Sequence, residues 1–334
     1  MGRDQGGRGA KSIVSKAATV YTIGEALIDF IPDERGVPLK QVSMFQRAPG
    51  GAPANVACAV SRLGGTSAFI GKLGADAFGD FLLDTLNSAG VNTNYISRTN
   101  QANTALAFVS LKADGNREFM FYRNPSADML LSGDEIDSEW FSGKDILHFG
   151  SVDLIEAPVK YAHIKAINSI KSKDGLVSFD PNVRLALWDD AQRCRETIND
   201  FIPYADILKI SDEELEFITG IAEEPKAIAS LFVGDVKVVA YTKGAQGAEL
   251  YTKDFNISVP ARKVEVVDTT GAGDAFTGAF LYKLLHNLEG LCSINKDAAY
   301  EMLDFANKAA SISVMRKGAI SSIPTLDEII SCIG

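Results

Sequence analysis

Short runs rich in β-branched residues alternate with longer helical patterns along most of this 334-residue chain, beginning at Thr19. This alternation is typical of a parallel sheet whose strands are joined by crossover helices, so the sequence predicts an α/β fold. Ligands of open α/β sheets bind beyond the carboxyl ends of the strands. The predicted strands mostly end at Gly, Asp, Ser or Thr, which we expect to line one crevice: 19–24, 66–71, 145–150, 176–180, 205–211, 236–242 and 264–268.

Two segments interrupt this alternation, at about 31–47 and 98–128. The second contains TALAFVSLKADGNREFMFYR, which alternates with a period of two on both sides of Asp114-Gly115 and is typical of a hairpin. Such strands need partners outside the main sheet, so we predict a small β-sheet lid that closes over the crevice and excludes water. The predicted organisation is a disordered tail at 1–17 and a single domain at 18–330 that carries the lid.

Composition excludes some partners. A formal net charge of -10 lacks the surplus of Lys and Arg that binding to nucleic acid requires. No apolar run is long enough to span a bilayer, and the Gly-rich basic N-terminus lacks the apolar core of a signal peptide. We therefore expect a soluble cytoplasmic protein with neither a nucleic-acid nor a membrane partner.

The segment VEVVDTTGAGDAFTGAFLYKLL carries the sharpest chemical signal. A predicted strand ends, a loop of small residues follows (Gly271, Ala272 and Gly273), and an apolar-faced helix begins. The free amides and positive dipole end of such a helix form an anion site, and the small residues leave room for a phosphoryl group. Asp274 lies at the rim, where a carboxylate suits removal of a proton from an attacking hydroxyl.

This segment also has simpler interpretations. Asp274 could merely cap the helix, as Asp often does near a first turn. A dinucleotide-binding fingerprint is disfavoured because Phe276 occupies its third glycine position and the loop lies near the end of the chain. A Walker A loop is absent, since Leu73 follows Gly71-Lys72. Any nucleotide must therefore be held in another way.

A second candidate site lies near the N-terminus. Gly50 and Gly51 precede a predicted helix and permit close approach to the backbone, and Asn55 offers an amide for hydroxyl recognition. Asp29 follows the first strand and could accept hydrogen bonds from two hydroxyls. Taken alone, the glycine pair is more often a turn, and Asp29 could simply begin a turn.

These two segments resemble the signatures of the ribokinase (PfkB) family of carbohydrate kinases, the first at 50–55 with its helix and the second at 268–280. The resemblance covers roughly residues 19–330. It implies a ribokinase-like three-layer fold with a mostly parallel central sheet and a small β-sheet lid. It also implies an ATP-dependent sugar kinase, and a homodimer formed through the lid.

The resemblance assigns roles residue by residue. For catalysis it implies Asp274 as general base beside Gly271, Ala272 and Gly273. For the sugar it implies Asp29, Gly50, Gly51, Asn55, Phe121, Arg123 and Arg184. For ATP it implies Lys209, Thr242, Lys243, Gly244, Gly247 and Asn307. For Mg²⁺, through water, it implies Glu214, and for a K⁺ ion Asp268, Thr270, Ser313, Gly318 and Ser322.

Some of these positions have other interpretations. Ser211 replaces the Asn of the family's Asn-x-x-Glu magnesium motif, and acidic residues favour the first turn of any helix, which Glu214 would also satisfy. Each arginine could be an ordinary solvated surface side chain.

Within the family the motifs are most similar to those of fructokinases. We therefore predict phosphorylation of D-fructose at the 6-hydroxyl. The alternatives are a 2-keto-3-deoxygluconate kinase, whose motifs match nearly as well, a ribokinase or another sugar kinase, and a catalytically silent sugar or nucleotide sensor. A nicotinamide dehydrogenase is disfavoured by the missing fingerprint.

Overall fold

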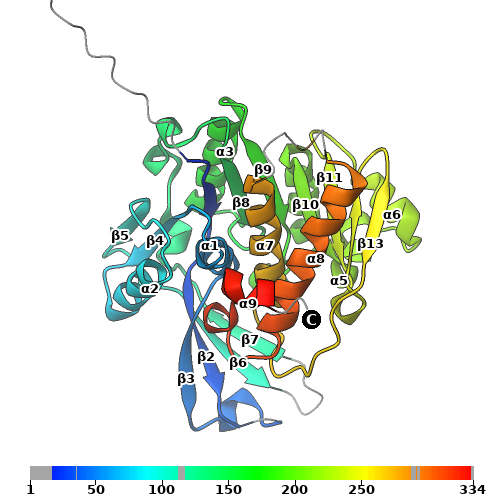
Figure 1. The fold of residues 1–334 in the computed structure, drawn as a ribbon. Coiled ribbons are helices and arrows are strands. Elements are labelled where there is room, and N and C mark those ends of the chain that lie inside the picture. Colours follow the sequence, from blue (N-terminus) through cyan, green and yellow to red (C-terminus); the bar gives the residue numbers. More distant parts are fainter. Residues whose placement is uncertain (1–16, 35, 112–116, 287–290, 292–293, 332–334) are drawn as a thin grey trace, which may run out of the picture.

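The computed structural model describes residues 17–331 except 35, 112–116, 287–290, 292 and 293. The predicted tail therefore lies almost wholly outside the described residues. Two sheets are formed, a large one in the body of the molecule and a small one that projects below it (Figure 1). The α/β fold class is confirmed.

The large sheet has nine strands in the order β13-β12-β11-β10-β9-β8-β1-β4-β5. Its strands from β5 to β11 are mutually parallel, and β12 is antiparallel to both of its neighbours. The strands are β1 (Val20–Ile23), β4 (Ser67–Gly74), β5 (Ile96–Thr99), β8 (Ile146–Gly150), β9 (Leu176–Asp180), β10 (Ile207–Ser211), β11 (Val238–Thr242), β12 (Ala248–Tyr251) and β13 (Asn256–Val259).

Helices cover both faces of this sheet: α1 (Ala52–Arg62), α2 (Ala77–Ser88), α3 (Pro158–Lys171), α4 (Ala191–Phe201), α5 (Asp212–Thr219), α6 (Glu224–Ser230), α7 (Ala272–His286), α8 (Lys296–Ser313) and α9 (Leu326–Ser331). Alternate strand residues pack on opposite faces. Tyr21, Leu147 and Val177 pack with residues of α3 to α6, whereas Val20 and Ile146 pack with residues of α1, α7 and α8. The result is the expected three-layer arrangement.

None of the helices in the described ranges is long and apolar enough to cross a membrane.

The small sheet has four strands in the order β3-β2-β6-β7, namely β2 (Leu27–Pro32), β3 (Phe45–Gly50), β6 (Leu106–Leu111) and β7 (Arg117–Tyr122). The predicted hairpin is confirmed by the antiparallel pairing of Leu106 with Tyr122 and of Leu111 with Arg117. Its predicted turn at Asp114-Gly115 lies outside the described residues. The predicted range 31–47 is too narrow, because β2 begins at Leu27 and β3 ends at Gly50. The predicted range 98–128 begins inside β5, which pairs with β4 in the large sheet.

One predicted strand is wrong. Residues 264–268 form no strand; Val266 is 59% and Val267 45% exposed. The segment is held at the end of α8, where the amides of Val267 and Asp268 donate to the carbonyl of Val314 at 2.8 and 3.1 Å. β-branched residues make a segment suitable for a sheet, but a strand also needs a partner, and no strand pairs with this segment in the described part of the chain.

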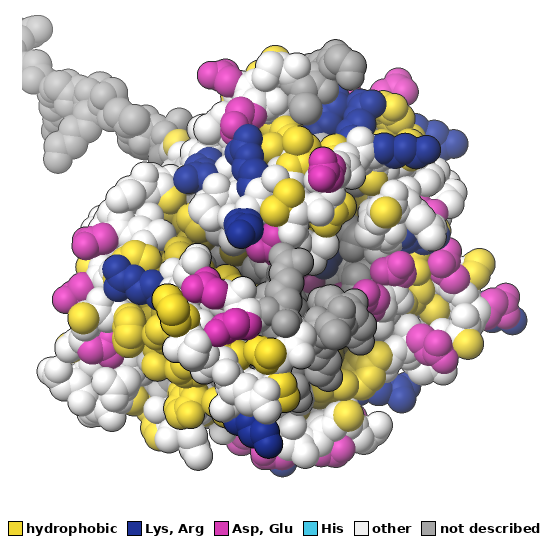
Figure 2. Space-filling model, turned by 90° about the horizontal axis from the view of Figure 1, so that it is seen from below, with side chains coloured by type: hydrophobic (Ala, Val, Ile, Leu, Met, Phe, Trp, Pro, Cys, Tyr) yellow, Lys and Arg dark blue, Asp and Glu magenta, His cyan; other side chains and the backbone are white. Residues whose placement is uncertain are grey.

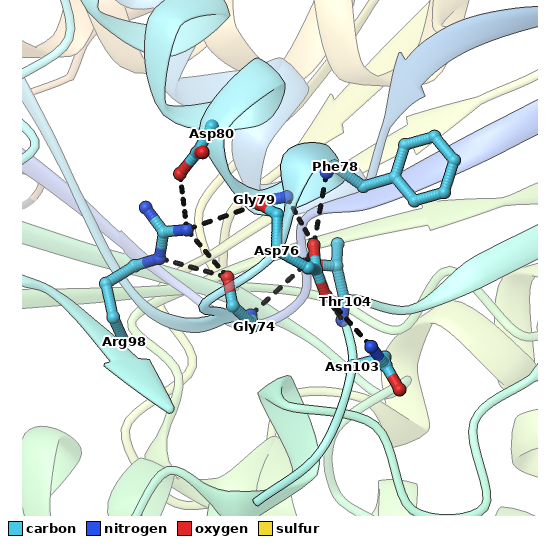
Figure 3. A network of polar contacts seen from close by, with 8 residues as sticks. All are labelled: Gly74, Asp76, Phe78, Gly79, Asp80, Arg98, Asn103 and Thr104. Atoms are coloured by element: carbon cyan, nitrogen blue, oxygen red, sulfur yellow. Dashed lines mark hydrogen bonds and ion pairs between the residues drawn. The ribbon is translucent and has the colours of Figure 1, made fainter. Parts of the chain in front are cut away.

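Asp76 anchors the chain that runs from the large sheet into the small one (Figure 3). It caps α2 by accepting from the amides of Phe78 and Gly79 at 3.1 and 2.8 Å. The same carboxylate accepts from the amide and hydroxyl of Thr104, both at 2.8 Å, just before β6 begins. Beside it, Arg98 donates to the carbonyl of Gly74 at 2.7 Å, which joins β5 to the end of β4. The first residues of the hairpin are thus fixed to the large sheet.

Helices α1 and α7 pack with their backbones close together. A Cβ atom placed on Gly278 of α7 would lie 2.3 Å from the Cβ of Ala59 in α1 and 3.1 Å from the carbonyl oxygen of Val56. Only glycine permits this approach. The two helices that carry the two recognised motifs therefore sit in direct contact.

Candidate active site

A cavity of about 490 Å³ lies where the large and small sheets meet, beyond the carboxyl ends of the central strands. It collects residues from both motifs and from the ends of β9 and β10. Of the predicted site residues, ten line it: Asp29, Gly51, Asn55, Phe121, Arg184, Lys209, Thr270, Gly271, Gly273 and Asp274. The family resemblance also places Asn182 near the sugar or the transferred phosphate, and Asn182 lines the cavity too. Sequence reasoning did not assign site roles to other lining residues, including Glu25, Asp180 and Glu213.

Asp274 belongs to the first turn of α7 and faces α1. Its Oδ2 accepts a hydrogen bond of 2.7 Å from Nδ2 of Asn55. Burial raises the pKa of the Asp274 carboxyl, while Asn55, Arg184 and Lys209 oppose that rise. A carboxylate with a raised pKa is a better proton acceptor than an ordinary Asp. The Oδ1 atom of Asn55 is buried without a hydrogen-bond partner among the described residues, which leaves an acceptor for a ligand.

The two glycines at the start of α7 have different roles: one permits a left-handed backbone conformation, and the other leaves space for a ligand. Gly271 has φ +75°, and a Cβ there would lie 2.9 Å from Cα of Ala319. At Gly273 the nearest heavy atom to an added Cβ is Nζ of Lys209, at 3.6 Å. The first amides of a helix have no partner within it, so this end of the 15-residue α7 can bind an anion beside a lysine.

Lys209 and Asp180 form a buried ion pair with Nζ 3.1 Å from Oδ2. Burial lowers the pKa of the Lys209 ammonium, but Asp180 and Glu214 more than offset this, so its pKa is raised and the group stays charged. Burial raises the pKa of Asp180 to about 6 against the opposing effect of Lys209. Asp180 ends the predicted strand 176–180, and its position there was the signal that could have identified it.

Two glycines shape the sugar side of the cavity. A Cβ on Gly50 would lie 2.2 Å from Oδ2 of Asp29, so the missing side chain makes room for that carboxylate. Gly51 has φ +106°, and a Cβ there would lie 2.4 Å from the backbone oxygen of Glu25. In place of a side-chain cap on Gly51, Oε1 of Glu25 accepts from the amide of Ala52 at 3.0 Å.

Arg123 is not among the residues that line the cavity, contrary to the expectation that it contacts the sugar. Its side chain is 3% exposed and is ion-paired with Asp128 and Asp153. These acidic residues follow the small sheet and β8 in sequence, so the arginine joins the end of β7 to the large sheet. The family resemblance implied a sugar contact for this arginine, but in the structure two buried carboxylates already accept hydrogen bonds from it.

The residues predicted to bind ATP, apart from Lys209, lie outside the cavity lining, near the ends of β11 and β13. Lys243 pairs with Glu224 and Glu249 at 2.8 and 2.9 Å. Asn307 donates from Nδ2 to the carbonyl of Val259 at 2.9 Å and so holds the end of β13. The others are Thr242, at the end of β11, and Gly244 and Gly247, in the turn that follows it.

Among the residues predicted to hold metals, Glu214 uses both carboxyl oxygens on protein groups. Oε1 accepts from the amide of Val183 at 2.7 Å, and Oε2 accepts from the amide and hydroxyl of Ser211 at 3.0 and 2.7 Å. Despite burial, Lys209 and these hydrogen bonds lower the pKa of Glu214. An ionised carboxylate held in this way suits contact with an ion through water.

The five residues predicted to bind K⁺ form two hydrogen-bonded groups. Asp268 accepts from the hydroxyl of Thr270 at 2.6 Å and from the amide of Gly318 at 3.0 Å. The hydroxyls of Ser313 and Ser322 lie 2.7 Å apart. Oxygen atoms of this kind fit a hard cation. No group of three or more His, Cys, Asp or Glu suited to a metal occurs in the described ranges.

Comparison with known proteins agrees with this geometry. Residues 17–326 match the model of the pfkB family carbohydrate kinases. Fructokinase-1 of Zea mays is 47% identical over 315 residues, which cover 94% of this chain and 97% of that protein. A fructokinase from Xylella fastidiosa with bound ATP is 35% identical with a TM-score of 0.84, covering 94% of this chain and 98% of its own. A double mutant of fructokinase from Vibrio cholerae O395, in a form with fructose, ADP and potassium ion bound, is 34% identical with a TM-score of 0.85, covering 95% and 98%. This chain belongs to the pfkB family of carbohydrate kinases.

Proposed function

We propose that this protein is an ATP-dependent fructokinase that phosphorylates D-fructose at the 6-hydroxyl. The observation that carries the proposal is the position of Asp274 at the anion-binding end of α7. Its carboxyl group has a raised pKa and accepts a hydrogen bond from Asn55, and it lines the same cavity as Asp29. A proton acceptor beside an anion site suits transfer of a phosphoryl group to a hydroxyl. The solved relative that holds fructose, ADP and potassium supports the substrate.

In this mechanism the chain's own groups align the reactants and offset charge. Asp29 and Asn55 orient the sugar, and Asp274 takes the proton from the attacking hydroxyl. Amides at 271–274, together with the Lys209 ammonium, stabilise the negative charge on the transferred phosphoryl group. The Asp180 carboxylate keeps that ammonium in place. Arg184, which is exposed and lines the cavity, is a further cation that can contact the phosphoryl group.

We place the rest of ATP along the ends of β11 and β13, at Thr242, Lys243, Gly244, Gly247 and Asn307. The Xylella fastidiosa relative with bound ATP supports a nucleotide site in this fold. Mg²⁺ would be held near Glu214 through water, and there it would offset the negative charge of the phosphates. K⁺ would be held by the oxygen donors of Asp268, Thr270, Ser313, Gly318 and Ser322, which stabilises the loop that presents Gly271.

We assign the small sheet the role of a lid that closes over the cavity and suppresses attack by water. It also offers a surface for a homodimer. Met44 is 63%, Met120 43% and Tyr122 57% exposed on or beside its strands. Figure 2 views the molecule from below, the side on which the small sheet lies, and hydrophobic side chains there form groups between the charged ones. We place the enzyme in the cytoplasm.

A 2-keto-3-deoxygluconate kinase is the main alternative within the family. The ion pairs that Arg123 makes within the protein argue against it. That substrate carries a carboxylate, which needs a cationic partner when it is buried. Arg123 and Arg184 are the two arginines that the family resemblance places at the sugar site. Arg123 already bonds to Asp128 and Asp153, so only Arg184 of the two remains for the substrate, and it also serves the phosphoryl group.

The test is a panel of sugars assayed with ATP and Mg²⁺ by coupled detection of ADP. We expect kcat/KM for fructose to exceed that for 2-keto-3-deoxygluconate, ribose and adenosine by at least about tenfold, or roughly 1.4 kcal/mol. A site built for hydroxyls reaches this discrimination because a poorly matched substrate leaves buried polar groups unpaired. A higher value for ketodeoxygluconate would refute fructose, and ADP formation with none of the sugars would refute the kinase in favour of a silent sensor.

A further inference from the structure

Glu25 lies in the wall of the cavity beside the residues proposed to bind the sugar. It lines the cavity together with Asp29, Gly51 and Asn55, and only 4% of its surface is exposed. Its carboxyl group is held at the start of α1, where Oε1 accepts from the amide of Ala52 at 3.0 Å. With that oxygen fixed by the helix, the other oxygen of the carboxyl group is available to carry a proton.

Behind Glu25 lies an excess of buried negative charge. Asp128 is 2% and Asp153 1% exposed, and both bond to Arg123, which is 8% exposed. The charge of Arg123 also acts on the nearby Glu25 carboxyl group. Three carboxyl groups therefore lie near one guanidinium, and full ionisation would leave two uncompensated buried charges. Burial of unpaired charge is costly, so Glu25 and Asp153 favour their protonated forms.

The groups that face Glu25 add to this effect. Burial is the main cause that raises the pKa of Glu25, to about 8; Asp153 raises it further, and Arg123 opposes the rise. Burial likewise raises the pKa of Asp153 to about 7. Because the groups interact, their protons belong to the cluster as a whole. The other charged residues that line the same cavity are Asp29, Asp180, Arg184, Lys209, Glu213 and Asp274.

We infer that Glu25 binds a hydroxyl of the sugar as a neutral carboxylic acid that donates a hydrogen bond. The inference rests on the proposed sugar kinase function and adds a donor to a site otherwise rich in acceptors. Asp29 and the unpaired Oδ1 of Asn55 can accept hydrogen bonds from the sugar hydroxyls. Each hydroxyl oxygen can also accept a hydrogen bond, and for that the site must supply a donor. Loss of the proton turns Glu25 into an acceptor-only carboxylate, and sugar binding weakens.

The sign of the pH dependence follows directly. Below pH about 8 Glu25 is protonated and donates; above it the donor is lost, so kcat/KM for the sugar falls by about tenfold for each further pH unit. Asp274 acts in the opposite sense, because its proton must be lost before it can serve as a base. The profile of the wild type should therefore have an acid limb from Asp274 and an alkaline limb from Glu25.

The experiment compares the full-length wild type with Glu25→Gln, Glu25→Ala and Glu139→Gln from pH 6 to 9.5. Gln keeps a donor and an acceptor at every pH, so Glu25→Gln should retain kcat/KM within about threefold at pH 7 and lose the alkaline limb. Glu25→Ala should raise KM for the sugar at least about tenfold with a smaller change in kcat. Glu139 is exposed and paired with Lys173 on the surface, so Glu139→Gln is the matched control and should keep the wild-type profile.

A role confined to capping α1 predicts a different result, because the amide of Gln would cap the helix without altering any pH profile. An alkaline limb that survives in Glu25→Gln, or a wild type without that limb, would overturn the inference. A loss of sugar affinity in Glu25→Gln as large as in Glu25→Ala would overturn it too, since a charged acceptor would then be required. If Glu25→Ala does not fold, the Gln variant alone decides. If fructose is not phosphorylated, the proposed substrate fails, and the same series is read with the sugar that is.

Discussion

Gly273→Val should separate folding from catalysis at the anion site. Gly273 has no positive φ, and an added Cβ would meet only the flexible end of Lys209, at 3.6 Å, which is an ordinary van der Waals contact. Gly and Val also differ by only a few tenths of a kcal/mol in helix propensity. We therefore expect the free energy of unfolding to change by less than about 1 kcal/mol, or a few degrees in Tm.

Turnover should behave differently, because the new side chain occupies the space between the α7 amides and Lys209 where the phosphoryl group is bound. Loss of one oxyanion-type donor costs about 100-fold to 1,000-fold in kcat, or about 2.7 to 4 kcal/mol, and blocking the site should cost at least this much. Thermal unfolding by circular dichroism and the coupled ADP assay measure the two effects on one preparation.

Gly271→Val is the matched comparison. Its φ of +75° and the approach of Cα of Ala319 to 2.9 Å impose both backbone strain and a clash, so this variant should lose more than about 2 kcal/mol of stability. A Gly273→Val enzyme that is folded and turns over within a few-fold of the wild type would refute the anion site. A Gly273→Val enzyme as unstable as Gly271→Val would refute the packing argument.

Three further predictions concern the base, the cation and acid stability. Asp274→Asn should lower kcat about 100-fold or more while calorimetry finds fructose and ATP binding changed only a few-fold; activity near that of the wild type would exclude Asp274 as general base. Replacing K⁺ with tetramethylammonium at constant Mg²⁺ should lower activity, and a flat response across a concentration series would remove K⁺ from the mechanism. Burial lowers the pKa of His148 to about 3, with a contribution from Lys209, and that of His163 to about 4. At these two histidines the unfolded chain binds more protons than the native one between pH 6.5 and 4, so each contribution to the free energy of unfolding decreases as the pH falls, by up to about 1.4 kcal/mol per unit. Urea melts across this range should show that His148→Gln loses this contribution relative to the wild type, and an unchanged slope would contradict it.

The fold was predictable where local pattern and tertiary pairing agree. The six predicted strands that the structure contains are short, apolar and buried, and each pairs with at least one parallel neighbour. The segment 264–268 is also rich in β-branched residues, but it has no partner strand in the described part of the chain, and composition alone does not show which strands pair. The strands β12 and β13, at one end of the large sheet, were not predicted because strands of four residues with mixed burial carry a weak periodic signal.

The site was predictable where a residue belongs to a local motif. Asp274, Asn55 and Gly51 were identified because their neighbours in sequence define their backbone geometry. Glu25 and Asp180 were not, because their chemistry comes from burial beside residues distant in sequence. Arg123 had the right type and position for a ligand contact, but the two carboxylates that bind it arrive from other elements.

The contact between Gly278 and Ala59 also bears on how this enzyme can be altered. The hydrogen bond between Asn55 and Asp274 joins α1 to α7. The distance between these two helices is set one turn further along each of them, where Gly278 contacts Ala59, and neither of these residues is catalytic. Any larger side chain at either position would push the helices apart and move the base away from the sugar. A library intended to change sugar preference should therefore hold this helix pair constant and vary the cavity wall around Asp29, Leu27 and Leu187 instead.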